Sequence, residues 1–335
     1  MRNEHYWMNK KVLITGAAGF IGSHLVETLV TAGADVRAFV RYTSRGDIGL
    51  LRYLPPDVLS KVEIISGDLR DPQAIQDAVK DQQIVYHLGA LISIPYSYRH
   101  PYETAEVNLM GTLNILQACR ENKVERLIHT STSEVYGTAQ QVPINETHPL
   151  KGQSPYSASK IGADKLAESY YCAFDLPVVT VRPFNTFGPR QSSRAVIPTI
   201  ITQALARKTI HLGNTQSTRD FTYIEDTVSG FLSAGESTSP DIYGKVFNLG
   251  TGKEILIGDV ASMVIKKIDP TIEIELDENR LRPQNSEVFR LISDNSLAGK
   301  VLGWHPQYEF EEGIDRTIEW IRENLGNYQI GVYQL

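Results

Sequence analysis

Apolar runs alternate with helical periods through the first half of this chain. Short apolar segments that predict buried strands lie at 11–15, 35–40, 62–68, 83–90, 126–133 and 178–185. Segments whose apolar residues recur at helical spacing predict helices at 24–33, 72–80, 111–123 and 157–174. Strands separated by helices favour an α/β fold built on a doubly wound parallel sheet with right-handed crossovers.

After the strand at 178–185 this alternation loosens. Stretches that contain Pro, Gly and Ser are mixed with shorter helical patterns, such as those at 195–208 and 257–268. We therefore predict a smaller α/β C-terminal lobe that binds substrate. The sheet domain is expected to comprise 9–180 together with roughly 221–250, and the lobe 181–220 and 251–325. The chain has no internal repeats and no low-complexity tracts.

Composition excludes several classes of protein. The 335 residues are 41% apolar and 21% charged, as in an ordinary soluble globular protein. The net charge of -6 gives no reason to expect a nucleic-acid partner. Cys119 and Cys172 form no CxxC or Cys/His cluster, so we expect two buried, unpaired thiols and no metal site.

The chain also lacks a pattern typical of export or of a membrane. Its first nine residues are too short and too polar for a signal peptide, and no later apolar run approaches the length of a membrane span. We expect a cytoplasmic protein with no membrane partner.

A glycine-rich turn, GAAGFIG, follows the first predicted strand. Gly16 permits a tight turn, Gly19 lets the backbone approach a pyrophosphate, and Gly22 allows the following helix to pack closely on the strand. Phe20 and Ile21 open that helix, whose amino end favours phosphate charge. The strand, turn and helix together predict a Rossmann-type dinucleotide-binding domain, although such a turn can also be only a tight connection.

Five further residues bear on the cofactor. Arg41 stands near the end of the second strand, where an acidic residue would bind the adenosine ribose of NAD. An arginine there can pair with a 2′-phosphate, so the sequence leans toward NADP, although Arg41 could equally stack on adenine or face solvent. Two predicted strands end on the same edge of the sheet, where ligands bind, at Asp68 and Leu69 and at Leu88 and Ala90. We expect these residues to contact the cofactor, although Asp68 could instead cap a helix.

The candidate reactive groups lie near the start of the helix predicted at 157–174 and at the end of the strand predicted at 126–133. Tyr156 and Lys160 have helical i, i+4 spacing and therefore share a face. A nearby ammonium lowers the pKa of a phenol, so that Tyr156 could accept a hydroxyl proton while hydride leaves the same carbon. Thr132, Ser133 and Glu134 end a strand upstream and could hold the substrate hydroxyl beside that phenol. In isolation such a Tyr/Lys pair would more often be structural.

Together these motifs resemble the extended short-chain dehydrogenase/reductases that modify nucleotide sugars. The matching stretches are GAAGFIG, GDLRD, HLGA, EVNLMGTLNIL, STSEVYG, PYSASK, RPFNTFGPRQ, TRDFTYIEDT, VFNLGTG and LRPQNSEV, in the family's order over nearly the whole chain. The chain is most similar to the nucleotide-sugar 4,6-dehydratases of legionaminic-type deoxysugar synthesis. This resemblance implies a tightly bound NAD or NADP, a nucleotide-diphosphate sugar as substrate, and a homodimer.

The resemblance also implies roles for single residues. Tyr156 would be the base at the sugar C4 hydroxyl, Lys160 would bind the nicotinamide ribose, and Thr132 would hydrogen-bond the C4 oxygen. Asn108 would shape the cofactor pocket. The residues expected to hold the diphosphate and nucleoside are Asn185, Arg219 and Arg282. The homodimer would form through a four-helix bundle of 111–123 and 157–174 with their counterparts, with Leu116, Cys119, Leu166 and Tyr170 on or near the seam.

The triplet after the fifth strand bears on the reaction. A ketone at C4 acidifies the C5 proton, which Glu134 could remove before the C6 hydroxyl leaves. Ser133 stands where many dehydratases carry an acidic proton donor, and serine is a poorer acid. The triplet also resembles that of decarboxylases acting on nucleotide-linked glucuronic acid, whereas simple 4-epimerases need no carboxylate there. We rank 4,6-dehydration of a uridine or guanosine diphosphate N-acetylglucosamine first, with retention at C5, ahead of 4-epimerisation, decarboxylation and a silent nucleotide-binding module.

Overall fold

A seven-stranded sheet forms the centre of the molecule in this computed structural model, which describes residues 5–331. The strands lie in the order β11-β6-β5-β4-β1-β2-β3, and each pairs in parallel with its neighbours. Their bounds are β1 (Lys11–Thr15), β2 (Asp35–Arg41), β3 (Glu63–Gly67), β4 (Ile84–His87), β5 (Arg126–Thr130), β6 (Val178–Pro183) and β11 (Val246–Leu249). The predicted doubly wound α/β fold is confirmed.

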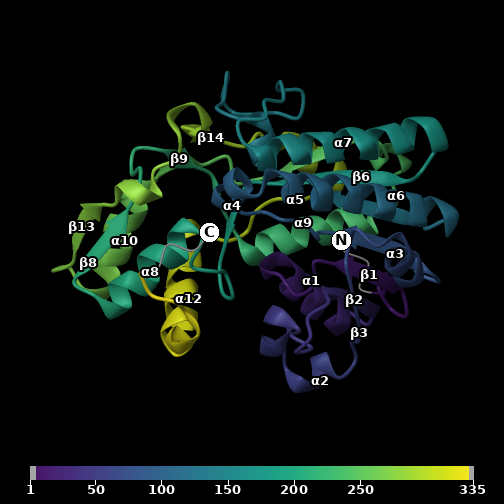
Figure 1. Cartoon of the computed structure of the whole chain (residues 1–335), viewed down its shortest axis with the longest axis horizontal. Helices are drawn as coiled ribbons and strands as arrows, with labels where there is room; N and C mark the ends of the chain where they lie inside the picture. The colour runs from purple at the N-terminus through teal and green to yellow at the C-terminus, as the bar shows by residue number, and fades with distance from the viewer. Residues whose placement is uncertain (1–4, 332–335) are drawn as a thin grey trace.

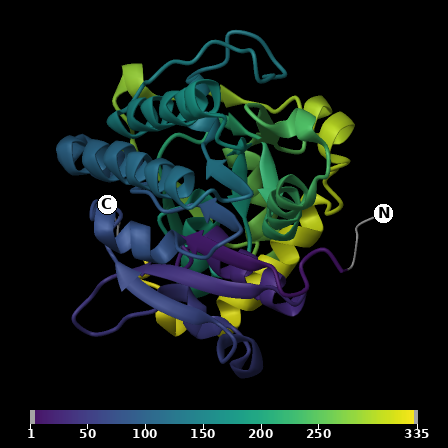
Figure 2. The same cartoon turned by 90° about the vertical axis from the view of Figure 1, so that its right-hand side faces the viewer.

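Helices cover both faces of this sheet (Figure 1). α1 (Phe20–Thr31) and α9 (Ile224–Glu236) pack together on one face. α3 (Pro72–Val79), α6 (Gly111–Glu121) and α7 (Pro155–Phe174) cover the other, where α6 and α7 lie side by side (Figures 1 and 2). Alternate residues of β1 supply the two cores, because Val12 and Ile14 belong to one and Leu13 to the other. Burial on both faces explains the unbroken apolar runs of the strands.

The second lobe lies at the opposite end of the molecule from β1 to β3 (Figure 1). Its helix α8 packs against α10 and α12, and β8 pairs with β13. Two small sheets, β10-β7 and β12-β9-β14, lie in the same part of the chain. The bounds are β7 (Asn185–Phe187), α8 (Val196–Ala206), β8 (Thr209–Leu212), β9 (Thr218–Arg219), β10 (Phe221–Tyr223), β12 (Ile255–Leu256), α10 (Ile257–Ile268), β13 (Glu273–Leu276), β14 (Arg290–Leu291), α11 (Ser296–Leu302) and α12 (Phe310–Glu323).

Shorter helical segments connect these elements. They are η1 (Gly49–Tyr53), α2 (Pro56–Leu59), α4 (Ile94–Arg99), α5 (Pro101–Ala105), the π-helical η2 (Glu106–Met110), η3 (Ser133–Tyr136), η4 (Pro240–Ile242), η5 (Glu278–Arg280), η6 (Gln284–Ser286) and η7 (Leu325–Asn327). None of the helices within residues 5–331 is both long enough and apolar enough to cross a bilayer.

Asp220 ties three segments together near the junction of the two lobes. Its side chain is fully buried and accepts hydrogen bonds from the backbone of Thr251 (2.8 Å), Gly252 (2.8 Å) and Ser293 (3.0 Å). The Thr251 hydroxyl also donates to it, at 2.7 Å. The Asp220 carbonyl accepts from the Asn185 nitrogen at 3.0 Å. The side chain thus ties the segments at residues 251–252 and 293 to the link between β9 and β10, whose backbone also bonds the start of β7.

Two expectations about single residues are wrong. Cys172 is exposed on α7, whereas Cys119 is buried as expected. Leu116, Cys119 and Tyr170 are all buried in the core between the sheet and its helices, so they are unavailable to a partner subunit. Helical periodicity predicts an apolar face but does not say whether the sheet or another chain covers it.

Candidate active site

The glycine-rich turn joins β1 to α1 and comes close to the turn after β4. Gly16 has φ +69°, which favours glycine, and a Cβ there would lie 2.7 Å from the Gly89 nitrogen. A Cβ on Gly22 would lie 2.2 Å from the Gly16 oxygen, so helix and turn pack as the motif predicts. Gly19 precedes α1, and no side chain in the described chain caps that helix end. The free backbone amides at the amino end of α1 therefore suit an anionic ligand such as a pyrophosphate.

Other predicted cofactor residues surround this turn. Phe20, Ile21 and Leu88 are partly buried against the core on the α1 face, whereas Leu69 packs against the opposite core. Ala90 is half-buried just after β4. The ends of β1, β3 and β4 thus frame one cradle at the carboxyl edge of the sheet, where parallel α/β folds bind their ligands. A dinucleotide fits this cradle, because the uncapped amides at the start of α1 can bind its pyrophosphate.

Asp68 is held by an arginine and does not cap a helix. Arg70 donates from Nε (3.0 Å) and Nη2 (2.7 Å) to its two carboxylate oxygens, and this pairing lowers the pKa of Asp68. The amino end of α3 is capped by Asp71, which accepts from the Gln73 and Ala74 nitrogens. The capping alternative for Asp68 is therefore wrong, and its carboxylate stays at the cradle rim.

Arg41 lies at the end of β2 with most of its side chain exposed. Its Nη2 lies 3.9 Å from Oε1 of Glu103, a carboxylate that also accepts from the Tyr96 hydroxyl at 2.6 Å. The charge of Arg41 also contributes to the lowered pKa of Asp68. The charge of Arg41 therefore acts on two carboxylates, those of Glu103 and Asp68. A 2′-phosphate bound by Arg41 would lie near both of them.

Asn108 ties the loop after β4 to α7. It is buried in the π-helical segment, and its Oδ1 accepts from the Leu91 nitrogen at 2.8 Å. Its Nδ2 donates to the Leu91 oxygen at 3.0 Å and to the Ser159 hydroxyl at 2.9 Å. Because Ser159 lies on the first turns of α7, this amide sets the distance between the cofactor cradle and Tyr156.

Tyr156 is buried in the first turn of α7. Ser154 and Ser157 form a reciprocal capping box there, with Pro155 as the first helical residue, so the helix start is well defined. Burial raises the pKa of Tyr156, a hydrogen bond with Thr132 opposes that shift, and the charge of Glu134 adds to it. The expectation that Lys160 lowers this pKa toward neutrality is therefore wrong for the protein alone.

Lys160 lies one turn further along α7 and is 3% exposed. Burial lowers its pKa to about 8, against the opposing effect of the Asp164 carboxylate. Its ammonium is therefore close to losing its proton at moderately alkaline pH, which weakens its effect on a neighbouring phenol.

Thr132, Ser133 and Glu134 form the turn that follows β5. The Thr132 hydroxyl caps η3 by accepting from the Glu134 nitrogen at 3.2 Å, and Ser133 is buried. The Glu134 side chain is 14% exposed, with its Oε1 3.8 Å from Nη1 of Arg282. The turn thus directs one carboxylate toward the second lobe and one hydroxyl toward Tyr156.

The predicted substrate residues of the second lobe form a charged cluster around that carboxylate. Arg219 is buried, donates to the Thr218 oxygen at 2.9 Å and lies 3.8 Å from Glu287. Burial lowers the pKa of Arg219, and the charges of Glu134, Arg282 and Glu287 also act on it. Asn185 begins β7, and its Oδ1 is buried with no hydrogen-bond partner among the described residues. This group brings two guanidinium ions and one unsatisfied amide together, a set that suits a diphosphate.

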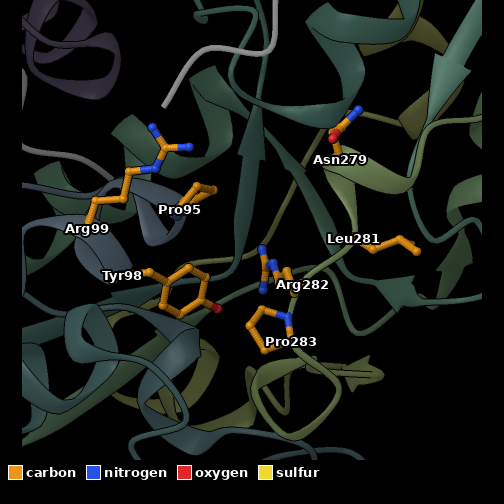
Figure 3. A pocket seen from close by; sticks show the side chains of 7 residues that line it. All are labelled: Pro95, Tyr98, Arg99, Asn279, Leu281, Arg282 and Pro283. Atoms are coloured by element: carbon orange, nitrogen blue, oxygen red, sulfur yellow. The ribbon is translucent and has the colours of Figure 1, made fainter.

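A small cavity between the lobes includes residues that the sequence did not single out. It has a volume of about 160 Å³ and lies between α4 and the loop that carries Arg282 (Figure 3). The Tyr98 ring points toward Arg282 and Pro283 across it, while its hydroxyl lies 2.5 Å from the Ser286 hydroxyl. The lining residues are Pro95, Tyr98, Arg99, Asn279, Leu281, Arg282 and Pro283. Residues 94–99 carry no motif, and only their position after β4 could have indicated this wall.

Comparison with known proteins identifies the class to which this fold and site belong. The family described as GDP-mannose 4,6 dehydratase matches residues 13–317, and this chain belongs to that family. Human dTDP-D-glucose 4,6-dehydratase is 32% identical over 332 residues, which cover 96% of this chain and 92% of the relative.

Solved structures match equally well. The dTDP-glucose 4,6-dehydratase DesIV from Streptomyces venezuelae, with NAD bound, has a TM-score of 0.85 and 28% identity over 95% of this chain and 98% of its own. A mutant UDP-glucuronic acid 4-epimerase from Bacillus cereus, in complex with a fluorinated UDP-glucuronic acid and NAD, has a TM-score of 0.85 and 29% identity over 94% and 99%. The predicted extended short-chain dehydrogenase/reductase relationship is confirmed, and the chain is an enzyme of the nucleotide-sugar dehydratase and epimerase group.

Tyr156→Phe should abolish turnover and leave cofactor binding nearly intact, because only the proton-accepting oxygen is removed. We expect a rate loss of about 10²–10⁴, measured as product formed from a nucleotide sugar. Tyr171→Phe, which removes an exposed hydroxyl from the same helix, is the control and should keep full activity. A Tyr156→Phe enzyme that kept more than about a tenth of wild-type activity would contradict this assignment.

Proposed function

We propose that this enzyme is a nucleotide-sugar 4,6-dehydratase that converts a nucleotide-linked hexose to its 4-keto-6-deoxy derivative. The observation that carries the proposal is the position of Glu134, a partly buried carboxylate two residues after Thr132 and across the cleft from Arg282. Its charge acts on the Tyr156 phenol, so the candidate base for C5 and the candidate base for the C4 hydroxyl belong to one site. A dehydration needs both groups, whereas oxidation at C4 alone needs only the phenol.

Oxidation at C4 is assigned to Tyr156 and Lys160. Tyr156 accepts the C4 hydroxyl proton, and Thr132 holds the same oxygen through its hydroxyl. A bound oxidised nicotinamide would supply a hydride acceptor for C4, a hydride donor for C6 once reduced, and a positive charge beside the phenol. Because burial raises the pKa of Tyr156 in the protein alone, that added charge and the Lys160 ammonium must together favour the tyrosinate. The glycine-rich turn, Asp68, Leu88, Ala90 and Asn108 would hold the dinucleotide.

Elimination across C5 and C6 is assigned to Glu134. The C4 ketone acidifies the C5 proton, which Glu134 removes, and the C6 hydroxyl departs with a proton as water. Glu134 can supply that proton itself once it is protonated, because the Ser133 hydroxyl is a far weaker acid. A solvent proton then returns to C5 on the Glu134 side, which retains the configuration, while Tyr156 releases the C4 proton to solvent. Atoms and charge then balance over the cycle.

The proposed substrate is N-acetylglucosamine linked to uridine or guanosine diphosphate. Arg219 and Arg282 support a diphosphate, because the planar fork of a guanidinium group can bond two phosphate oxygens at once, and the two charges act on each other within one cluster. Asn185 adds a buried amide oxygen that lacks a partner among the described residues, which suits a hydroxyl donor of the ligand. The sugar itself rests on the resemblance to legionaminic-type dehydratases.

4-Epimerisation is the second candidate function. If the 3.8 Å pair of Glu134 and Arg282 is only structural, Glu134 removes no C5 proton and the remaining groups act at C4 alone. Matches to named epimerases over more than nine-tenths of the chain also favour this function. Decarboxylation of a nucleotide-linked glucuronic acid is a further outcome that the experiment below distinguishes.

Glu134→Gln tests the reaction class. The amide should still permit C4 oxidation, because Tyr156 and Lys160 are untouched, and the enzyme should then stall with reduced cofactor. The measurements are the absorbance of reduced nicotinamide and the mass of the product from a panel of uridine and guanosine diphosphate sugars. Glu309→Gln, which changes an exposed carboxylate of the second lobe, is the control and should turn over normally.

Each outcome of that experiment has one meaning. Loss of water from the wild-type product supports dehydration, an isomer of equal mass shows epimerisation, and release of carbon dioxide shows decarboxylation. A Glu134→Gln enzyme that dehydrates at the wild-type rate removes Glu134 from the mechanism.

The choice between NAD and NADP turns on Arg41. Its guanidinium supports NADP, our sequence prediction, because it could pair with a 2′-phosphate. Glu103, at 3.9 Å, partly neutralises that charge and disfavours a second anion, and the matching DesIV and epimerase structures hold NAD.

If Arg41 binds a 2′-phosphate, Arg41→Asp should shift the preference toward NAD by about 10- to 100-fold, the range of one charge-assisted hydrogen bond. Calorimetric titration of both cofactors into apoenzyme measures the ratio. Arg45→Asp, which introduces the same charge change in the exposed loop after β2, should leave that ratio unaltered. A wild-type protein that already prefers NAD strongly shows that Arg41 does not bind such a phosphate.

The oligomer is proposed to be a homodimer joined through α6 and α7. Leu113 and Leu166 are only partly buried at the edge of the core beneath these helices, and Phe174 is 45% exposed. These apolar side chains, rather than the buried Leu116, Cys119 and Tyr170, are available to the partner.

Light scattering at micromolar concentration should return twice the 37.4 kDa mass of one chain. Leu166→Glu should shift the mass toward one chain, because it places a charge in the apolar contact. A wild-type mass near 37.4 kDa would rule the dimer out.

A further inference from the structure

A buried carboxylate lies one helical turn beyond Lys160. Asp164, on α7, is 5% exposed and accepts hydrogen bonds from three side chains. Ser131 donates to Oδ2 at 2.7 Å, Arg182 donates to the same oxygen from Nη2 (2.8 Å) and Nε (3.2 Å), and His129 Nε2 lies 3.0 Å from Oδ1. Burial opposes ionisation, but the hydrogen bond from His129 and the charges of Arg182 and Lys160 outweigh it and lower the pKa of Asp164. The group is therefore a carboxylate throughout the working pH range.

The ring nitrogens of His129 can be assigned from this contact. An ionised carboxylate only accepts, so His129 Nε2 must carry the proton, and Nδ1 is left without a hydrogen-bond partner among the described residues. Burial lowers the pKa of His129, and it lowers that of the neighbouring His87, whose nitrogens contact the hydroxyls of Thr15 (2.8 Å) and Thr112 (3.1 Å). Both imidazoles are therefore neutral.

The charges around Lys160 can then be counted element by element. β4 contributes neutral His87, β5 contributes neutral His129, and α7 contributes neutral Tyr156 and the Asp164 carboxylate. Arg182 on β6 is already engaged by two hydrogen bonds to that carboxylate and by one, at 2.9 Å, to the Tyr136 hydroxyl. Among residues 5–331, Asp164 is the negative charge that acts on Lys160 strongly enough to oppose its burial.

The two groups act on each other through the buried interior and form no contact ion pair in the described chain. Lys160 and Asp164 stand at i, i+4 on one helix, where Cβ atoms are about 5–6 Å apart. Both side chains are at least nine-tenths buried, so water screens the pair little. The hydrogen bonds from Ser131, His129 and Arg182 fix the carboxylate and keep it from swinging out to solvent.

We propose that Asp164 is a positioning residue of the reaction, whose fixed, buried charge one helical turn away favours the ammonium form of Lys160 beside Tyr156. The inference rests on the proposed role of Lys160 in C4 oxidation. Without Asp164, burial would lower the pKa of Lys160 unopposed, and the ammonium beside the phenol would be less populated.

Asp164→Asn tests this by removing the charge and keeping the shape. We expect the Lys160 ammonium to titrate about 1–2 pH units lower, followed by NMR of lysine-labelled enzyme with Lys160→Met for assignment. The alkaline limb of the pH-rate profile should move down by the same amount. Glu168→Gln, which changes an exposed carboxylate one turn further along α7, should move neither.

Two more variants keep the test decisive. Asp164→Asn leaves Arg182 buried without its counter-charge, so Asp164→Asn combined with Arg182→Met removes both charges and should show the same lowered titration if the single variant does not fold. Asp164→Glu restores the charge and should restore the wild-type titration even if it lowers stability.

The titration of Lys160 needs no substrate, so it separates this inference from the proposed function. An unchanged Lys160 titration in a folded variant that lacks the Asp164 carboxylate overturns the role of Asp164. A lowered titration in an enzyme that catalyses no dehydration supports the role and rejects only the reaction class.

Discussion

The parallel pairing of all seven strands is the constraint on which the rest of the molecule depends. Because parallel strands share one direction, their carboxyl ends meet at a single edge, and each crossover must bring a helix back over a face of the sheet. The turn at Gly16, the loop at Leu88, the turn at Thr132 and the strand that begins at Asn185 all follow strands that end at that edge. Segments more than a hundred residues apart in sequence therefore form one site.

Burial sets the chemistry of that site as much as the identity of its residues does. Removal of water raises the pKa of Tyr156 and lowers that of Lys160, so the two groups proposed as base and cation both resist ionisation. A single carboxylate placed in the same dry interior consequently has a large effect. Asp164 has that position, and the bonds from His129 and Arg182 hold it there. The protonation states of Tyr156 and Lys160 therefore depend on the position of a few buried charges, of which Asp164 is one.

The second lobe completes the site from the opposite side. Asp220 joins the backbone of β9 and β10 to segments near residues 251 and 293, which holds Arg219 in place next to it. Arg219 and Arg282 then face Glu134 across the cleft. This arrangement gives a diphosphate and a reactive carboxylate adjoining positions. In the proposed function, a substrate that bridges the two lobes would bring its sugar to Tyr156 and its phosphates to the arginines.

The sequence by itself determined the parallel α/β fold, the glycine-rich turn and the Tyr156, Lys160 and Thr132 set, because strand and helix periods and short motifs are local properties. It failed where a property depends on distant neighbours. Only the tertiary structure decided that Arg70 holds Asp68 and that Leu116 faces the sheet rather than a partner. It also decided which charges surround Lys160, since desolvation and Coulomb energy depend on distances across the sheet that no local pattern encodes.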